Sequence, residues 1–421
     1  MSARLQSMSF GADYQAHLAA YGTNPEIPAE TLRLAVQDSG LRGRGGGWFP
    51  TGQKMQSVVR NAELHHHGCA VICNAMEGEP ASTGDQWLAT YQPHLIIDGT
   101  ELAAHAVGAE HAYIAAHAGG TMIANLERAL AQRPSSKVKI VAAPARYVAS
   151  EESALARFIS GGTAAPVFGQ RPYAHGVHGR PTLVNNAETL SHVALIARHG
   201  AQWFRSVGAK DAPGTTLVSV GGDVAKPAVI EVPTGTAVAD LIAAAGGVTG
   251  PISGIRTGGY GGTWAGPGLL DAAWDPDGLR AQGLAVGSGI LWPMASHRCG
   301  IVESAITFNY LAGESAGQCG VCTFGLSATA EDMVALANRQ LDSAGAQRLH
   351  DRLRSIPRRG GCALPDGAVR MAQTALQVFA TEEQAHLQGH CTAASSYPTD
   401  QWTPTPPAGP RPVIAHGRHF E

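Results

Sequence analysis

Two cysteines spaced two residues apart, Cys319 and Cys322, together with a distant third at Cys362, form the clearest candidate for a metal or cluster site. Thiolates at this spacing at a helix start can both reach one metal centre. A structural zinc site normally takes four ligands, usually as two such pairs, and only one pair is present. Burial is the competing interpretation for any cytosolic cysteine, and we expect Cys69, Cys73 and Cys391 to lie in the core.

A glycine-rich stretch at 43–54, GRGGGWFPTGQK, is a second candidate. Glycines let a backbone approach a ligand closely and aim several N–H groups at a phosphate, while Arg44 and Lys54 add positive charge. A flexible loop is an equally common reason for such a run. Because the stretch precedes the first expected strand, the usual dinucleotide fingerprint does not fit.

Three more stretches concentrate hydrogen-bonding groups: 73–80 (CNAMEGEP), 147–155 (YVASEESAL) and 179–189 (GRPTLVNNAET). Each follows an expected strand or turn. Carboxylates there could hold ribityl or ribose hydroxyls, and a flavin needs such groups along its ring edge and phosphate tail. Solvated loop acids are the alternative interpretation.

Strand and helix patterns alternate between Cys69 and Val141. We expect strands at 70–72, 112–116 and 138–141, and helices at 98–109 and 122–132, the second capped by Thr121. This order predicts a parallel sheet with ligands at the carboxyl ends of its strands. The run His65 to His67 is interpreted as a solvated turn.

The pattern changes near residue 212. Strands at 217–224 and 229–232 predict a hairpin, followed by a helix that Thr236 caps and that Gly246 and Gly247 end, which is typical of a small β-grasp module at 208–297. Helical composition at 301–312, 324–340, 343–354 and 366–388 predicts a small bundle. The segment 392–421, rich in Pro, Thr and Ser, is expected to be a disordered tail.

Composition excludes several classes of protein. The 421 residues carry a net charge of -3 and are 44% hydrophobic, which allows two to four domains. There is no run of about 18 apolar residues, no signal-peptide pattern and no basic, aromatic patch for nucleic acid. We expect a cytoplasmic protein with small-molecule cofactors and protein partners.

Taken in order, the five stretches resemble the flavoprotein subunit of respiratory complex I and its relatives in NAD-linked hydrogenases and formate dehydrogenases. That family carries GLRGRGGAGFPTG, CNADESEPG, GEETAL, GKPTxxNNVET, a ligand-binding β-grasp module and ESCGxCxPCRxG with a final cysteine. The resemblance covers roughly 12–390. It implies an α/β fold with a Rossmann-like FMN domain at 1–207, a β-grasp (SLBB) domain at 208–297 and a helical iron–sulfur domain at 298–391.

The resemblance also implies cofactors and site residues. Hydride would pass from NADH to FMN, and electrons would then pass through the cluster to a ferredoxin-like partner or a hetero-oligomeric complex, including one peripheral to a membrane. Glu152 would lie between both ligands, Phe49 and Glu79 would face the nicotinamide, and Cys319, Cys322 and Cys362 would bind the cluster. The implied FMN ligands are Gly43, Arg44, Gly45, Lys54, Asn74, Glu77, Tyr147, Glu151, Glu152, Val184, Asn185, Asn186 and Thr189.

The chain departs from the family at the cluster, because Ala316 occupies the first cysteine position. Each iron of a cubane needs its own terminal ligand, so three thiolates leave a three-iron cluster, a four-iron cluster with a non-cysteine ligand, or no cluster. Cys299 is a candidate replacement ligand, with burial in the helix beginning near Ile301 as the alternative.

The nicotinamide side differs as well. Trp48 replaces a glycine and could fill part of the NADH space, Met76 replaces an aspartate, Ser150 replaces the glycine of GEETAL, and a basic-aromatic KPPF segment becomes 170–173. Three hypotheses stay open: an NADH-oxidising enzyme, a non-enzymatic FMN and iron–sulfur electron-transfer module, and a scaffold that has lost its redox centres.

Overall fold

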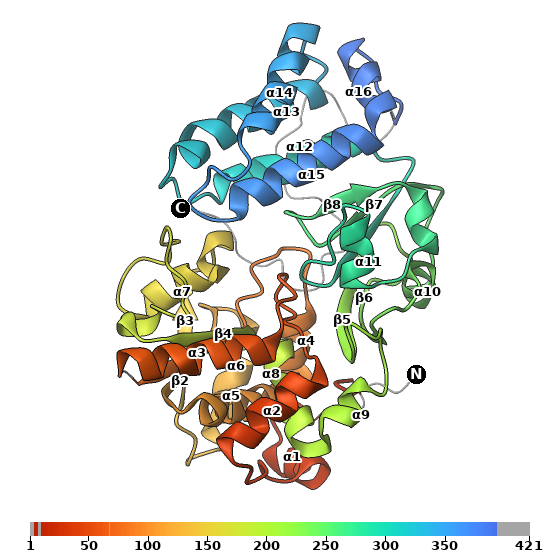
Figure 1. The fold of residues 1–421 in the computed structure, drawn as a ribbon. Coiled ribbons are helices and arrows are strands. Elements are labelled where there is room, and N and C mark those ends of the chain that lie inside the picture. The colour runs from red at the N-terminus through yellow and green to blue at the C-terminus, as the bar shows by residue number, and fades with distance from the viewer. Residues whose placement is uncertain (1–3, 7–9, 67, 394–421) are drawn as a thin grey trace.

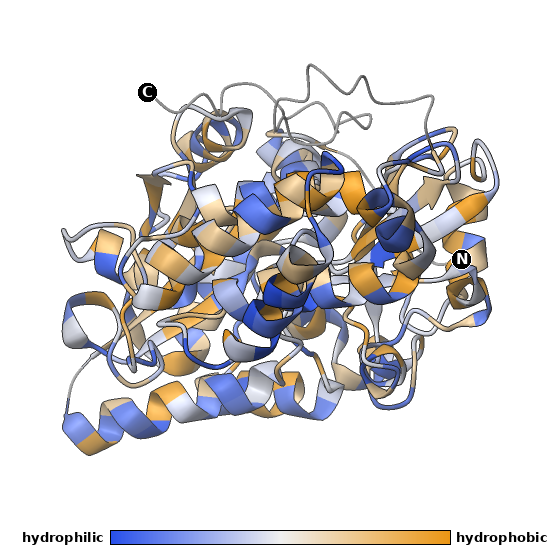
Figure 2. Ribbon diagram, turned by 90° about the horizontal axis from the view of Figure 1, so that it is seen from above, coloured by the Kyte–Doolittle hydropathy of each residue, from blue (hydrophilic) through white to orange (hydrophobic). Residues whose placement is uncertain are grey.

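The computed structural model describes residues 4–6, 10–66 and 68–393. Figure 1 shows three parts: an α/β domain, a smaller mixed domain beside it, and a layer of helices across the top of both. Among the described residues, no helix is long and apolar enough to cross a bilayer, and Figure 2 shows polar and apolar residues mixed along the helices.

The first domain is built on a parallel sheet of order β3-β2-β1-β4. Its strands are β1 (Cys69–Asn74), β2 (Ala109–His117), β3 (Val138–Ala143) and β4 (Thr182–Asn186). The predicted parallel sheet is confirmed. The helices around it are α1 (Tyr14–Tyr21), α2 (Ala29–Ser39), α3 (Thr51–His65), α4 (Gly84–Tyr91), α5 (Pro93–Val107), α6 (Thr121–Ala131), α7 (Glu152–Ile159), α8 (Ala187–His199) and α9 (Ala201–Arg205), with single turns η1 (Tyr147–Ser150) and η2 (Val177–Gly179).

Two predicted boundaries in this domain were wrong. The helix expected at 98–109 begins at Pro93, because proline is well tolerated in a first helical turn. Thr121 is the first residue of α6 and not its cap: Gly120 is the N-cap, and the Thr121 hydroxyl accepts a hydrogen bond from Gln86 Nε2 at 3.3 Å.

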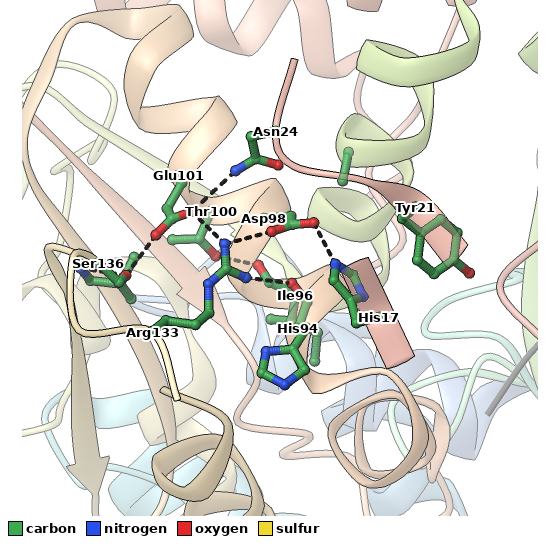
Figure 3. A network of polar contacts seen from close by, with 12 residues as sticks. His17, Tyr21, Asn24, His94, Ile96, Asp98, Thr100, Glu101, Arg133 and Ser136 are labelled. Carbon is green, nitrogen blue, oxygen red and sulfur yellow. Dashed lines mark hydrogen bonds and ion pairs between the residues drawn. The ribbon is translucent and has the colours of Figure 1, made fainter. Parts of the chain in front are cut away.

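A buried ionic network joins the helices behind the sheet (Figure 3). Asp98 of α5 is 2% exposed and accepts from His17 at 2.9 Å, Arg133 at 2.7 Å and Arg198 at 2.6 Å. Burial alone would raise the pKa of Asp98, but these three partners outweigh it and lower that pKa. The carboxylate thus connects α1, α5, α8 and Arg133, which lies two residues after α6.

The second domain is a five-stranded sheet of order β6-β5-β9-β7-β8. The predicted hairpin is confirmed as β5 (Thr215–Val220) antiparallel to β6 (Ala228–Pro233), and β9 (Ile290–Ala295) pairs in parallel with β5, as in a β-grasp fold. Thr236 does not cap the helix, which begins two residues later, because its hydroxyl donates to the Pro233 carbonyl at 2.7 Å. The remaining elements are α10 (Val238–Ala244), β7 (Ile252–Thr257), β8 (Thr263–Ala265), η3 (Pro267–Asp271) and α11 (Pro276–Ala281).

The third domain is the predicted helical bundle. Its elements are α12 (Gly300–Gly313), a π-helical turn η4 (Val321–Leu326), α13 (Ser327–Ala337), α14 (Ser343–Ser355), α15 (Leu364–Val378) and α16 (Ala380–Leu387). The segment predicted as one helix at 366–388 is two, because the chain leaves helical geometry at Phe379. Fully buried Phe308, Met333 and Leu336 lie in its core.

Two sequence predictions fall partly outside these elements. His65 and His66 are exposed at the end of α3, in agreement with a solvated turn, and His67 lies outside the described residues. Most of the segment predicted as a tail, from residue 394 onward, also lies outside them.

Candidate functional site

A cavity of about 440 Å³ lies at the carboxyl ends of β1 and β4. This is the point at which the strand order reverses, where open α/β sheets bind their ligands. All three domains contribute to its wall. The predicted site residues that line it are Gly43, Arg44, Gly45, Phe49, Lys54, Asn74, Glu77, Glu79, Tyr147, Glu151, Glu152, Val184, Asn185, Asn186 and Cys362.

The glycine-rich stretch covers most of the loop between α2 and α3 together with the first turn of α3, and the loop folds back on itself. Gly43 N–H donates to the Phe49 carbonyl at 2.9 Å, and Arg44 N–H donates to the Thr189 hydroxyl at 2.8 Å. A Cβ at Gly45 would lie 3.1 Å from Asn186 Cβ, so only glycine fits there without a shift. Thr189 is fully buried behind this loop and is not part of the cavity wall, so its contact is with the loop backbone.

Arg44 is a buried cation with unused hydrogen-bonding capacity. Its Nη2 donates to the Thr215 carbonyl at 3.0 Å and its Nε lies 3.6 Å from Glu188, yet Nε and Nη1 have no hydrogen-bond partner among the described residues. Asn185 Nδ2, at the end of β4, is also buried without a partner within that part of the chain. Burial lowers the pKa of Arg44 to about 10, so the side chain still carries its charge at neutral pH.

These buried donors test whether FMN fits the cavity. Buried donors in native proteins normally have a partner, so donors that lack one within the chain point to a ligand rich in acceptors. A phosphate and the carbonyls of a flavin ring supply such acceptors. The residues present therefore fit FMN.

Trp48 lies in the wall between the cavity and the β-grasp domain. It is 4% exposed, packs in the β-grasp core, and donates from its indole nitrogen to the Gly287 carbonyl at 2.9 Å. The Arg44 guanidinium lies 4.3 Å from its ring centroid. Met76 is buried in the core cluster that also contains Ala70 and Ile72 of β1, and it is not part of the cavity wall.

Two acidic residues stabilise helix α4 at the cavity edge. The Glu77 carboxylate accepts from the backbone N–H groups of Asp85 at 2.9 Å and Gln86 at 3.0 Å, which are first-turn donors of the helix. Asp85 accepts from Asn186 Nδ2 at 2.8 Å through both oxygens. Burial, and then the charge of Glu77, raise the pKa of Asp85 well above its usual value.

Glu79 and Tyr147 join the three domains. One Glu79 oxygen accepts from the Tyr260 N–H of the β-grasp domain at 2.6 Å, and the other accepts from the Tyr147 hydroxyl at 2.9 Å. Tyr147 N–H donates to Glu314 of the bundle at 2.6 Å. Burial and the neighbouring Glu79 charge raise the pKa of Tyr147, which keeps the phenol neutral.

The remaining charged residues lie at the mouth of the cavity. Lys54 and Glu152 form an ion pair, and Glu151 accepts from the Ser153 and Ala154 N–H groups as the N-cap of α7. Phe49 is 53% exposed, so its ring is accessible to a second ligand.

The three candidate cluster cysteines converge between the bundle and the cavity. Burial opposes ionisation of Cys319, but hydrogen bonds from the backbone of Gly361 and Cys322 outweigh it and lower the pKa of its thiol. Burial, with Cys319 beside it, raises the pKa of Cys322 to about 12. Cys322 lies in the π-helical turn, a geometry that recurs at functional sites.

This donor set fits a cluster in which one iron has no cysteine ligand. Ala316 packs against the bundle core and offers no ligand atom. Three thiolates suit a three-iron cluster or a four-iron cluster with one other ligand. Cys362 also lines the cavity, so the cluster site and the flavin-sized space are adjacent.

The other cysteines are divided between the core and a second group. Cys69 and Cys73 are buried, as predicted. Cys299 is fully buried at the start of α12, and its sulfur lies 3.3 Å from His386 Nε2, which favours burial over replacement of the missing cluster ligand. Cys391 packs against the edge of the bundle core, as predicted, but it is only half-buried and lies beside Cys299 and His386.

A cavity that fits FMN, with one of the three cluster-type cysteines in its wall, defines the class of flavin and iron–sulfur electron-transfer proteins. Comparison with known families agrees part by part. The Nuo51 FMN-binding domain matches residues 36–195, the SLBB domain matches 217–259, and the iron–sulfur binding region of NADH-ubiquinone oxidoreductase F matches 304–386.

Whole-chain relatives narrow the class. The F 2 subunit of NADH-quinone oxidoreductase from Rhizobium meliloti (strain 1021) is 30% identical over 405 residues, which cover 91% of this chain and 94% of that protein. The corresponding F subunit from Streptomyces coelicolor is 30% identical over 391 residues, or 86% and 84% of the two chains. The chain belongs to the family of NADH-quinone oxidoreductase F subunits.

Solved structures show the same fold. The chain of an NAD+-reducing [NiFe]-hydrogenase in the air-oxidised state has a TM-score of 0.80 at 29% identity, covering 91% of this chain and 66% of that one. The H2-reduced state gives 0.77 at 30% identity, covering 86% and 63%. This chain therefore spans slightly less than two thirds of the hydrogenase chains that it matches.

The sequence interpretation missed Asp85 and Ser219 as residues of the cavity wall, and it included Glu188 in the 179–189 stretch without assigning it to the site. Asp85 lies five residues beyond the quoted CNAMEGEP stretch. An acidic residue in the first turn of a helix, as Asp85 is in α4, was the sequence pattern that could have indicated it. Ser219 is inside the predicted hairpin, where no local pattern marks it as part of a site.

Proposed function

We propose that this chain accepts reducing equivalents from NADH at an FMN held in the cavity and passes electrons through a cluster to a redox protein partner. The observation that carries the proposal is the single cavity that runs from the glycine loop at 43–49 to Cys362. Bound FMN accepts a hydride and releases its electrons one at a time. The protein then has to position the two ligands, exclude water and keep the cluster within reach.

In this proposal the phosphate and the ring of FMN have different binding residues. The backbone N–H of Gly45, with the charges of Arg44 and Lys54, holds the phosphate and the ring edge. Gly43 lets the loop backbone approach the ligand closely, while its own N–H closes the loop onto the Phe49 carbonyl. Lys54 exchanges part of its contact with Glu152 for the ligand. The other FMN-binding residues are Asn74, Glu77, Tyr147, Glu151, Glu152, Val184, Asn185 and Asn186, with Thr189 acting through the Arg44 backbone.

We assign Phe49 and Glu79 to the nicotinamide side. Phe49 presents an exposed ring, and Glu79 is held in a fixed orientation by Tyr147 and Tyr260. The same two hydrogen bonds favour a second candidate function, a non-enzymatic FMN and iron–sulfur electron-transfer subunit, because both Glu79 oxygens already have partners.

The proposed cluster is bound by Cys319, Cys322 and Cys362, as [3Fe-4S] or as [4Fe-4S] with a non-cysteine ligand. The proposed domains are 1–207, 208–297 and 298–391, followed by a tail at 392–421. Because the relatives are named as subunits, we place the chain in a cytoplasmic hetero-oligomer, either free or peripheral to a membrane complex, with a ferredoxin-like or other redox subunit as its electron acceptor.

Anaerobic addition of NADH to flavin-loaded protein tests the enzyme. Loss of flavin absorbance supports NADH oxidation, and unchanged absorbance with dithionite-reducible flavin supports the second candidate. Iron and sulfide analysis with electron paramagnetic resonance tests the cluster: we expect about three irons per chain, or a labile fourth, from the ligand count. Zinc without sulfide at these cysteines would contradict the assignment.

A further inference from the structure

Three metal-ligating side chains meet outside the cavity, at the end of the bundle. Cys299 precedes α12, His386 lies on α16, and Cys391 follows α16. Their ligand atoms all lie within 4.8 Å of one another, and Cys299 Sγ is 3.3 Å from His386 Nε2. They share no residue with the three cysteines assigned to the cluster.

The histidine is oriented as a metal ligand would be. Its Nδ1 lies 2.9 Å from the Leu336 carbonyl oxygen, which can only accept a hydrogen bond. Nδ1 therefore carries the ring proton, and the lone pair of Nε2 faces the Cys299 sulfur. Metal-binding histidines almost always donate their second nitrogen to a carbonyl or carboxylate in this way.

The environment is preformed and largely closed to water. Cys299 is 0% exposed and His386 is 1% exposed. Glu382, one turn before His386, accepts from the Gly300 N–H at 2.7 Å and holds the start of α12 beside α16. Phe379 is buried in the same core as Cys299.

The donor set and its spacing suit one divalent ion. With bond lengths of about 2.3 Å to sulfur and 2.0 Å to nitrogen, a tetrahedral zinc site puts sulfur roughly 3.5 Å from nitrogen and 3.8 Å from the second sulfur. The Cys299–His386 separation of 3.3 Å is close to this scale, and the other two separations are at most 4.8 Å, about 1 Å from it. Two thiolates neutralise the charge of Zn²⁺, which suits a buried site, and thiolate with imidazole ligands selects zinc over hard cations.

We propose that Cys299, His386 and Cys391 bind one Zn²⁺, with the fourth position taken by water or by Glu382. The ion fastens the last helix and the residues after it to the start of α12. Arg298, the residue before Cys299, forms ion pairs with Asp223 of the β-grasp domain and with Glu303 of α12. The zinc thus stabilises the junction between the bundle and the β-grasp domain.

Metal analysis of the full chain, purified anaerobically, tests the site. We expect about one zinc per chain in addition to iron, and a zinc content at least roughly fivefold lower in Cys299→Ala, His386→Gln and Cys391→Ala. Iron should stay at the level of the unmodified protein in all three variants. Cys73→Ala, which removes a buried cysteine of β1, is the matched control and should keep its zinc.

Cobalt binding provides a second measurement, made on the unmodified protein and on the variant whose changed side chain is least buried. Co²⁺ added to zinc-depleted protein should give thiolate-to-cobalt absorption in the near ultraviolet, and this absorption should be weaker in Cys391→Ala, whose changed side chain is only half-buried. Three results would overturn the proposal: no zinc in the unmodified protein, a disulfide between Cys299 and Cys391 in protein as purified, or iron that falls together with zinc. The last would assign Cys299 to the cluster.

Discussion

Replacing Asn185 by leucine tests whether this side chain contributes to FMN binding or to the stability of the apoprotein. Asn185 is the second-to-last residue of β4, is 5% exposed, and has a buried Nδ2 without a hydrogen-bond partner in the described part of the chain. A buried donor left unpaired costs roughly 1–3 kcal/mol. Leucine is close in shape and removes that cost, so the free energy of unfolding of the apoprotein should not fall.

FMN binding should weaken in the same variant. A neutral hydrogen bond contributes about 0.5–1.5 kcal/mol net, and leaving the ligand's acceptor desolvated brings the loss to about 1–3 kcal/mol. At about 1.4 kcal/mol per factor of ten, this predicts a Kd for FMN roughly 5- to 150-fold higher. The assay is titration of apoprotein by quenching of FMN fluorescence, with urea unfolding of the same preparation.

Asn186→Leu is the matched control, one residue along the chain. Asn186 Nδ2 donates to both Asp85 oxygens at 2.8 Å, and its Oδ1 accepts from the Glu188 N–H at 2.9 Å as the N-cap of α8. This variant should lose both FMN affinity and stability, the latter by about 1–3 kcal/mol. The reasoning is refuted if Asn185→Leu binds FMN as tightly as the unmodified protein, or destabilises the apoprotein as much as Asn186→Leu.

The cluster, the ionic network and the cavity wall each allow one further test. Where the purified protein holds about three irons, Ala316→Cys should raise iron to about four per chain and remove an oxidised-state paramagnetic signal; iron that stays at three in this variant would contradict the ligand assignment. Asp98→Asn should cost about 3–5 kcal/mol in urea unfolding, because it leaves buried cations uncompensated. The pKa of Asp98 is lowered in the folded state, so the contribution of Asp98 to the free energy of unfolding is complete above the unfolded pKa of about 3.9 and is lost as pH falls below it. The variant should lack this acid dependence between pH 5 and 2. An equal fall of the free energy of unfolding with pH in both proteins would contradict the assignment to Asp98. Trp48→Gly should cost about 3–5 kcal/mol by emptying the β-grasp core; faster flavin reduction by NADH with little loss of stability would show that the indole fills the nicotinamide space.

The order of elements could be predicted from the sequence because it depends on local patterns. The strands β1 to β3 and the hairpin of β5 and β6 have apolar runs that mark them locally in the sequence. The two wrong caps have a common cause. The Thr121 hydroxyl accepts from Gln86, and the Thr236 hydroxyl donates to the Pro233 carbonyl, so neither hydroxyl caps a helix. Residue preferences for the N-cap position do not predict such contacts.

Site residues in quoted motifs could be found, but their partners could not. Glu79 and Tyr260 are 181 residues apart, and Cys299 and His386 are 87 apart. Only the packing of the β-grasp domain and of α16 brings these pairs together. For the same reason Ser219, on a strand of another domain, could not be recognised as part of the cavity wall.

The two main departures from the family motifs have different physical consequences. The Trp48 indole packs into the β-grasp core and donates to the Gly287 carbonyl, so this change lies at the contact between two domains. Ala316 removes a ligand atom, and no neighbouring cysteine compensates among the described residues, because Cys299 faces His386. Cluster type, net charge and hydrogen bonding set the reduction potential of an iron–sulfur centre. We therefore expect this chain to differ from its relatives more in the potential at which electrons leave than in how it binds FMN.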